Sequence, residues 1–572
     1  MSAREESGGF IDLFSPLTTR KIIVFLICIG LFVYFNSLFN GLVLEDRVEI
    51  VRNPSIWNIQ NIPNLFVSQV GGQETIGYYR PLVFGIYALI YSLFATAPFP
   101  YHLMQLVFEI ASSCMVFLVL RKYIKKEISF FLAVLFLVHP VNEEAVAWVS
   151  LFQDPVYLFF GLLAIYVLQN NRDKVRDFIL VNAFLLLSLF AKESGVLFLI
   201  LAFVYVFLLN RKNLLIYSIL SFFTALFYIA LRFSSRIPIQ KVPLIPIMKL
   251  TLAERLTNIP AIIFYYIKTF LYPADLSVYH SWVIRDMNLN SFLVPLILDL
   301  IFFTLLAAIF VKAYKASKNS KELIFFSVWL VVGLAFYLQI IPLDFTVAEH
   351  FFLVPFVGLA GLVGLSLQNI RVSKSTKSVG LYIAIFILVA LGVRTMIRNT
   401  NWQSQLTILK HDEKSSGGDY LIELVYSTSL IEDNKPDEAM PRVRRALTLY
   451  PESWFAWDNL GAVYYEKGDI KDAKNAYLHS IAISKSFNAY ENLGLLIKST
   501  EPPSSSIKFL RQATQMFPTS AKLWYYRFIV AYKLKNRDEE LLSAKNYFLL
   551  KRDDESYAIY NQLLQNKPIV IN

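Results

Sequence analysis

Long apolar runs recur through the first 400 residues and leave few choices for the fold. One extends from Ile22 to Phe39, and further runs follow it. Such runs are typical of transmembrane helices, because a bilayer core about 30 Å thick needs about 20 apolar residues of helix. With 56% hydrophobic residues and a mean hydropathy of +0.49, the chain is more apolar than an ordinary soluble protein. We therefore expect a polytopic membrane protein.

Basic residues between the runs predict the topology. Arg20 and Lys21 precede the first run, and basic loops follow at 121–126, 312–322 and 371–377. Cytoplasmic loops carry an excess of Lys and Arg, so the net charge of +11 is explained without nucleic acid. About eleven spans result, with the N-terminus in the cytoplasm and the C-terminal part outside. An apolar stretch within 237–291 is predicted to be interfacial or re-entrant, since a span there would place 312–322 outside.

After Arg398 the composition becomes that of a soluble helical protein, and a repeat appears. The best copy matches the tetratricopeptide pattern at Trp457, Leu460, Gly461, Tyr464, Gly468, Ala473 and Tyr477. Stacked helix pairs of this kind bury their apolar faces only against their neighbours. The predicted fold class is all-α, a polytopic helix bundle followed by an α-solenoid. The predicted parts are a cytoplasmic tail (1–20), a membrane domain (21–400) with an outer loop (41–99), a linker (401–419), repeats (420–553) and a closing segment (554–572).

Motifs for common cofactors are missing from the sequence. The two cysteines, Cys28 and Cys114, lie in apolar runs, which predicts packing roles and provides no disulfide framework or CxxC site. No GxGxxG or GxxxxGK[ST] motif occurs. We expect no cofactor, and the sequence leaves the need for a metal open. No cleavage site for a signal peptidase follows the first run, which predicts a retained span.

Polar residues gather instead at the predicted outer ends of the spans. They are Glu45, Asp46, Arg80, His102, His139, Glu143, Glu144, Asp154, Lys192, Glu193, Asp344, Glu349, His350, Arg394 and Arg398. Each alone is compatible with a charged side chain that reaches water at a span end. Several lie against apolar sequence, where ionisable groups are costly and are usually paired or functional. Neighbouring carboxylates such as Glu45 and Asp46 raise one another's pKa, which suits a general base; the alternative is that they cap a loop or pair with Arg47 and Arg52.

Pieces of sequence along the whole chain carry a family resemblance. They are "LEDRVEIVRNP", "YYRPLV", "YHLMQLVFE", "HPVNEEAVAWV", "AKESGV", "LYPADLSVYHSW", "VAEHFFLVPFVGL" and "RTMIRNTNWQ", followed by the repeats. In this order they resemble the transmembrane and tetratricopeptide-repeat glycosyltransferases, bacterial relatives of the eukaryotic protein O-mannosyltransferases in the GT-C class. The resemblance implies transfer of a sugar from a polyprenyl phosphate to a hydroxyl acceptor.

The resemblance also implies roles for individual residues. The family's acidic pair falls on Glu45 and Asp46, and an acid there acts as the base toward the acceptor. The first acid is usually Asp in the family and is Glu45 here, so Asp46 is an alternative base. The acid of the "HPxxxEA" piece falls on Glu144, where it positions the acceptor or the sugar. The basic residue of the family's "ERY" piece becomes His350, which leaves other cations to meet the lipid phosphate.

The predicted catalytic residues are Asp46, Glu45 and Glu144. The predicted substrate-binding residues are Arg80, His102, His139, Lys192, Glu193, Glu349, His350, Arg394 and Arg398. This chemistry also suits the residues without the family, because a polyprenyl-linked sugar presents its anionic linkage at the membrane rim. The repeats would hold a protein or peptide acceptor, and a bacterial inner membrane is the expected location. The alternatives are a non-catalytic envelope scaffold and a transporter; the latter predicts internal symmetry, which the sequence does not show.

Overall fold

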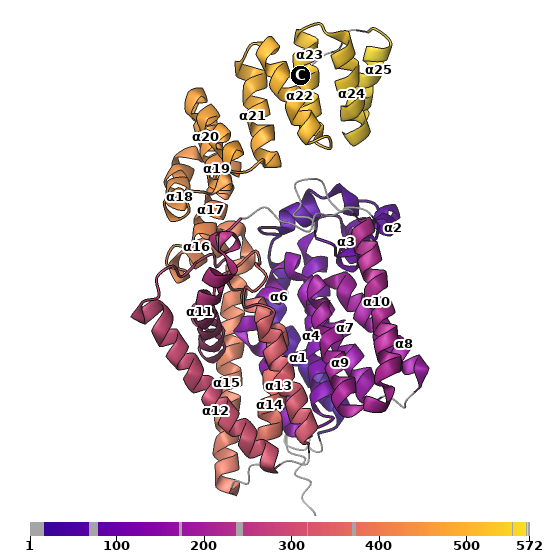
Figure 1. Ribbon diagram of the computed structural model, residues 1–572, viewed down its shortest axis with the longest axis vertical. Coiled ribbons are helices and arrows are strands. Elements are labelled where there is room, and N and C mark those ends of the chain that lie inside the picture. The colour runs from indigo at the N-terminus through magenta and orange to yellow at the C-terminus, as the bar shows by residue number, and fades with distance from the viewer. Residues whose placement is uncertain are drawn as a thin grey trace, which may run out of the picture. The chain divides into compact units, whose positions relative to one another are not determined.

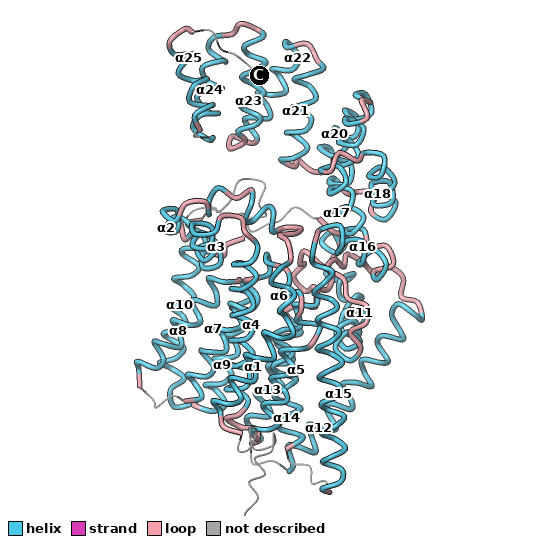
Figure 2. Tube along the Cα trace, turned by 180° about the vertical axis from the view of Figure 1, so that it is seen from behind, coloured by secondary structure: helices cyan, strands magenta, loops and turns pink. Residues whose placement is uncertain are grey.

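The computed structural model describes residues 17–67, 78–170, 174–235, 244–316, 319–368, 373–551, 553–567 and 569. Within these ranges the regular structure is helical and no β-strand occurs, which confirms the predicted all-α fold class (Figure 2). The chain divides into two compact units. The described residues of the second unit are 244–249 and those from Gly417 onward, and the other described residues form the first unit.

The first unit is a bundle of long apolar helices joined by turns and by longer segments such as 272–288 and 336–348. Helix α7 packs against α4, α8 and α9, while α13 packs against α14 (Figure 1). The helices are α1 Thr19–Tyr34, α2 Ile62–Leu65, α3 Pro81–Phe94, α4 Pro98–Leu120, α5 Lys126–Val138, α6 Glu144–Ala147, α7 Gln153–Gln169, α8 Val175–Ala191, α9 Val196–Leu209, α10 Leu214–Ser234, α11 Leu252–Leu271, α12 Val294–Ala316, α13 Ser320–Ala335, α14 Leu353–Leu367, α15 Lys374–Asn399 and α16 Gln405–Ser415.

All eleven predicted spans fall on helices, but the helices differ in length. Among the described residues, seven helices are long and apolar enough to cross a membrane, or up to eight with the bent pair formed by α5 and the segment after it. That pair bends by 54° at His139 and Pro140, because proline has no N–H to continue the helix. Helices α8, α9 and α13, which carry three of the predicted spans, are only 17, 14 and 16 residues long. Helix α11, predicted to be interfacial or re-entrant, is not among the seven.

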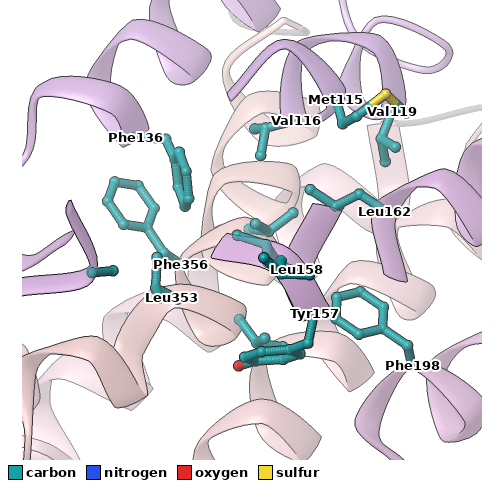
Figure 3. Close-up of a cluster of buried hydrophobic side chains, with 14 of the residues drawn as sticks. Met115, Val116, Val119, Phe136, Tyr157, Leu158, Leu162, Phe198, Leu353 and Phe356 are labelled. Carbon is teal, nitrogen blue, oxygen red and sulfur yellow. The ribbon is translucent and has the colours of Figure 1, made fainter. Parts of the chain in front are cut away.

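Close helix contacts hold the bundle together. Figure 3 shows side chains of α4, α5, α7, α9 and α14 interleaved in its core. A Cβ on Gly161 of α7 would lie 2.2 Å from the Phe198 ring of α9, and one on Gly361 of α14 would lie 2.1 Å from the Phe326 ring of α13. Small residues permit such approaches, and packing of this kind drives helix association where lipid removes the hydrophobic driving force.

The second unit is the predicted solenoid of helix pairs. Its helices are α17 Tyr420–Glu432, α18 Pro436–Leu449, α19 Trp454–Glu466, α20 Ile470–Ile483, α21 Phe487–Thr500, α22 Pro503–Met516, α23 Ala521–Lys533, α24 Arg537–Lys551 and α25 Asp554–Leu564. A serine caps the first helix of three pairs, at Ser453, Ser486 and Ser520. Gly461 admits the ring of Tyr477, which would lie 2.5 Å from a Cβ at that glycine. The repeat signature is therefore a set of local packing contacts.

Candidate active site

The turn after the first span is held in a strained conformation. Leu44 has a φ of 53°, in the left-handed region that costs a residue with a Cβ about 1–2 kcal/mol. Its N–H donates to Oε1 of Gln405 at 3.2 Å, 361 residues away in the chain. Strain of this kind persists only where the surroundings impose it, and it is concentrated at functional sites. The two acids that follow Leu44 are therefore placed by tertiary contacts.

Asp46 is fully buried and saturated with hydrogen bonds. Its Oδ1 accepts from the N–H and the hydroxyl of Ser150, at 2.6 and 2.7 Å. Its Oδ2 accepts from the N–H of Val43 at 3.0 Å. Burial nevertheless raises the pKa of Asp46 to about 7, against these hydrogen bonds, which lower it. Asp46 thus ties the turn to the segment before α7 and has no surface left for a substrate.

Glu45 lies differently, although it is the adjacent residue. Its side chain keeps part of its surface exposed, and the hydroxyl of Tyr279 donates to it, 3.2 Å from each carboxylate oxygen. The pKa of Glu45 is raised to about 7, chiefly by burial and to a smaller extent by the negative charges of Asp46 and Asp344, while the hydrogen bond from Tyr279 lowers it. A carboxyl group that is accessible and has a pKa near neutrality has the properties of a general base.

Glu49 is a third acid of this turn, which the sequence analysis did not single out. It follows Glu45 by four residues, within the π-helical turn Arg47–Val51, so the two point to the same side. Burial raises the pKa of Glu49 to about 8, while the positive charge of Arg80 lowers it. The four-residue spacing in "EDRVEIV" was the available signal.

Arg80 brings a cation to this group of acids. Its guanidinium carbon lies 3.8 Å from the centroid of the Tyr78 ring, and its Nε lies 3.7 Å from Oε2 of Glu193. Within the described part of the chain that Nε has no hydrogen-bond partner, although Arg80 is only 7% exposed. The hydroxyl of Tyr78 donates to Asp344 at 2.6 Å. Arg80 is therefore a buried cation with donor capacity that no side chain takes up.

Lys192 is the second cation of the site. Its Nζ lies 2.6 Å from Oδ1 of Asp154, which is fully buried at the start of α7. The same ammonium lies 5.6 Å from the centroid of Tyr157 and 5.9 Å from that of Phe351. Both cations have a carboxylate beside them, but the ion pair of Lys192 is hydrogen-bonded at 2.6 Å, whereas Glu193 lies 3.7 Å from the Nε of Arg80.

Two further acids come from the start of α6 and from the turn Glu349–Phe352 before α14. Oε2 of Glu144 lies 2.9 Å from Nδ1 of His350. Oε1 of Glu349 accepts from the hydroxyl of Tyr265 at 2.7 Å and from the N–H of Ser277 at 3.1 Å. Glu144 and Glu349 also contact each other through their side chains. These groups can donate to and accept from several hydroxyls, as a sugar requires. In the described ranges no group of His, Cys, Asp or Glu is arranged to hold a metal ion.

Two of the predicted arginines have structural partners. Arg398 is fully buried and donates to both carboxylate oxygens of Asp412, at 2.7 and 3.3 Å. Its Nε lies 3.7 Å from Oε2 of Glu143. Arg394 donates to the backbone carbonyl of Ala274 at 2.8 Å. The structure thus uses these two residues to fasten α16 and the loop after α11.

The other two predicted histidines, His139 and His102, are buried within the helix bundle. His139 has both ring nitrogens within reach of backbone groups, the carbonyl of Phe270 at 3.0 Å and the N–H of Val141 at 3.2 Å. Its ring stacks on Phe270. His102 is fully buried on α4, beside the backbone of Asn40 and Gly41. The two ring nitrogens of His102 have no hydrogen-bond partner among the described residues, but both rings are buried away from the surface.

The structure therefore brings most of the predicted site residues into one connected group. Contacts and charges link Glu45, Asp46, Arg80, Lys192, Glu193, Glu144, Glu349 and His350 through segments 44–49, 78–80, 150–154, 192–193 and 344–350. The residues that sequence reasoning missed are Glu49, Ser150, Tyr78, Tyr265, Tyr279 and Asp412. Most of them are neutral, and a hydroxyl in an apolar chain has no signal until its partner is known.

No family model matches the chain. A human protein named protein O-mannosyl-transferase TMTC3 is 22% identical over 628 aligned residues, which cover 93% of this chain and 68% of that protein. The mouse protein of the same name is 24% identical, over 85% of this chain and 59% of its own length. The chain thus spans about three fifths to two thirds of these relatives. Among solved structures, ArnT from Cupriavidus metallidurans bound to undecaprenyl phosphate is 12% identical with a TM-score of 0.41, over 86% of this chain and 80% of that one.

Proposed function

We propose that the chain, which is similar to proteins named protein O-mannosyl-transferase, transfers a sugar from a polyprenyl phosphate to a protein hydroxyl. Mannose is the sugar in the names of those relatives, and it is the sugar we propose first. The observation that carries the proposal is that a partly exposed carboxyl, Glu45, and a buried guanidinium, Arg80, whose Nε has no hydrogen-bond partner among the described residues, both act electrostatically on Glu49.

The transfer needs a base and a place for the leaving group. The oxygen of the acceptor hydroxyl attacks the anomeric carbon, and its proton passes to the carboxylate of Glu45. The bond between that carbon and the phosphate oxygen breaks, and its electron pair stays on the phosphate. Arg80 then stabilises the negative charge of the leaving phosphate, because a preorganised donor in a dry site acts strongly on charge that develops there. Lys192, whose Nζ lies 2.6 Å from Asp154, adds a second positive charge that attracts the leaving phosphate.

The remaining residues hold the geometry. Asp46 fixes the turn that carries Glu45 through its bonds to Ser150. Glu144, Glu349 and His350 provide donors and acceptors for the sugar hydroxyls. In the family resemblance an arginine occupies the position of His350, and here Glu144 holds the histidine at 2.9 Å. The phosphate therefore depends on Arg80 more than the resemblance implies, because His350 lacks a permanent charge.

The donor assay tests this proposal directly. The full chain in lipid nanodiscs should transfer labelled mannose from a synthetic polyprenyl phosphate to Ser/Thr peptides. Arg80→Gln should lower kcat/KM for the donor about a hundredfold to a thousandfold, because one preorganised donor to the oxyanion is lost. Arg176→Gln is the matched control, since the Arg176 side chain is 85% exposed on α8. Unchanged activity of Arg80→Gln, or no transfer from any lipid-linked sugar, contradicts the proposal; the second outcome favours the scaffold.

The proposed orientation places the repeats on the outer face of the membrane. It is supported by the basic residues at 20–21 and 121–126, and it follows if the number of spans is odd, as in the predicted eleven. In a chain without Cys28 and Cys114, Ser505→Cys on α22 should react with a membrane-impermeant maleimide in intact cells. Glu127→Cys, at the start of α5, should react only after lysis; both positions are exposed. The reverse labelling pattern would place the repeats and the site in the cytoplasm.

A further inference from the structure

The loop between α13 and α14 is held by a glutamine in a strained conformation. Gln339 is fully buried and has a φ of 61°, in the left-handed region that is costly for a residue with a Cβ. Its Nε2 donates to the carbonyls of Phe345 and Thr346, at 2.6 and 3.0 Å, and its Oε1 accepts from the N–H of Leu343 at 2.9 Å. Strain of this kind is concentrated at functional sites, and here it fixes the backbone of residues 343–346.

A second set of hydrogen bonds fastens the same loop to the segment after α11. The N–H of Thr346 donates to the carbonyl of His280 at 2.8 Å, and its hydroxyl donates to the carbonyl of Trp282 at 2.7 Å. Thr346 is fully buried, whereas the two residues before it, Asp344 and Phe345, stay partly exposed. The fold thus presents a carboxylate and an aromatic ring side by side on a rigid support.

The ring of Phe345 lies between two parts of the proposed site. Its centroid is 5.9 Å from that of Tyr279, the tyrosine whose hydroxyl donates to Glu45. It is also 6.4 Å from the centroid of the His350 ring, at an interplanar angle of 90°, and Glu144 holds that histidine at 2.9 Å. The ring of Phe345 therefore connects the proposed base with residues proposed to hold the sugar hydroxyls.

Asp344 extends this group toward the proposed phosphate site. Its Oδ2 accepts from the hydroxyl of Tyr78 at 2.6 Å, and the guanidinium carbon of Arg80 lies 3.8 Å from the centroid of the Tyr78 ring. The negative charge of Asp344 also acts on Glu45. Asp344 is therefore near both the cation proposed to meet the phosphate and the acid proposed as base.

We propose that Asp344 and Phe345 form the subsite for the pyranose ring of the lipid-linked sugar, an assignment that rests on the proposed function. A pyranose has an apolar face of C–H groups, which packs on the electron-rich face of an aromatic ring, and a rim of hydroxyls, which donate to a carboxylate. The two adjacent residues supply one group of each kind. During transfer the sugar is the reactant that adjoins both the base and the leaving phosphate, so the position of the loop favours the sugar over the acceptor peptide.

Donor binding by the full chain in lipid nanodiscs tests this assignment. The probes are a synthetic mannosyl polyprenyl phosphate and the same polyprenyl phosphate without the sugar. The parent should bind the sugar-bearing lipid at least about tenfold more tightly, a difference of about 1.4 kcal/mol. Phe345→Leu and Asp344→Asn should each remove most of that difference without weakening the binding of the sugar-free lipid. Phe345→Tyr keeps the aromatic ring and should preserve the difference.

The segment before α12 offers matched controls. Phe292 is a partly buried phenylalanine of the turn Leu289–Leu293, and Asp286 is an exposed aspartate of the same segment. Phe292→Leu and Asp286→Asn should keep the parent's preference for the sugar-bearing lipid. A thermal melt of each variant verifies that the protein is folded.

Three outcomes would overturn the assignment, and they separate it from the proposed function. If the parent transfers mannose and both loop variants keep its preference for the sugar-bearing lipid, the subsite is excluded and the proposed function stands. A raised KM for the acceptor peptide, with unchanged affinity for the donor, assigns the loop to the acceptor. A parent that binds neither lipid and transfers no sugar contradicts the proposed function, and the subsite with it.

Discussion

Replacing Glu45 by Gln should lower the turnover of sugar transfer about a hundredfold to ten-thousandfold, the usual loss when a general base is removed. Gln keeps the shape of the side chain and the bond from Tyr279 at 3.2 Å, but it cannot take the acceptor's proton. Because the side chain is partly exposed, the variant should fold and insert normally. The measurement is transfer from the lipid donor, with the amount of folded protein determined in parallel.

The pH profile and two further variants give the controls. With the pKa of Glu45 at about 7, kcat/KM of the parent should fall tenfold per pH unit below that value and level off above it, because the base must be deprotonated. Glu45→Asp should keep the sloping profile and most of the rate; Glu45→Gln should lose the slope.

Asp46→Asn should reduce both rate and thermal stability, since an amide cannot accept all three hydrogen bonds. Parent-like turnover of Glu45→Gln would exclude Glu45 as base, and Glu144 would be tested next.

Replacing Arg398 by Met should lower the free energy of unfolding by about 3–5 kcal/mol, the cost of breaking a buried ion pair on one side. The substitution leaves two buried carboxylates, Asp412 and Glu143, without the cation that lies 2.7 and 3.7 Å from them. The measurement is chemical or thermal unfolding of the purified protein. The folded fraction should keep the parent's KM for the donor, because Arg398 is not among the groups proposed to meet the phosphate.

A double variant provides the control for this pair. Arg398→Met with Asp412→Leu should recover part of the lost stability, since an apolar pair of similar volume can replace a buried ion pair. The recovery of stability should be incomplete, because Glu143 remains a buried carboxylate without the Arg398 cation. If Arg398→Met unfolds like the parent but loses affinity for the donor, the original sequence prediction is right and Arg398 belongs to the phosphate site.

These two predictions show where sequence reasoning stopped. The pattern "LEDRVE" marked the turn as special, but it did not distinguish the two adjacent acids. Ser150, 104 residues away, makes Asp46 a structural residue, and Tyr279, 234 residues away from Glu45, leaves that side chain partly open. Similarly, Arg398 was one cation among several until its partner was known. The four-residue spacing between Glu45 and Glu49 could have identified Glu49 from the sequence, whereas no spacing pointed to Ser150 or Tyr279.

The sequence by itself determined the properties that depend on near neighbours. Apolar runs predicted the helices of the bundle, because each helix satisfies its own backbone and needs only local composition. The repeats were equally visible, since contacts such as Gly461 with Tyr477 join residues 16 positions apart. Only the tertiary structure decided which charges are compensated and which stay available. Asp154 and Asp412 form hydrogen-bonded ion pairs with Lys192 and Arg398, at 2.6 and 2.7 Å, while the carboxylate of Glu193 lies 3.7 Å from the Nε of Arg80, which has no hydrogen-bond partner in the described ranges. The reason is that the state of a buried charge depends on groups within a few ångströms, which long-range folding brings from distant parts of the chain.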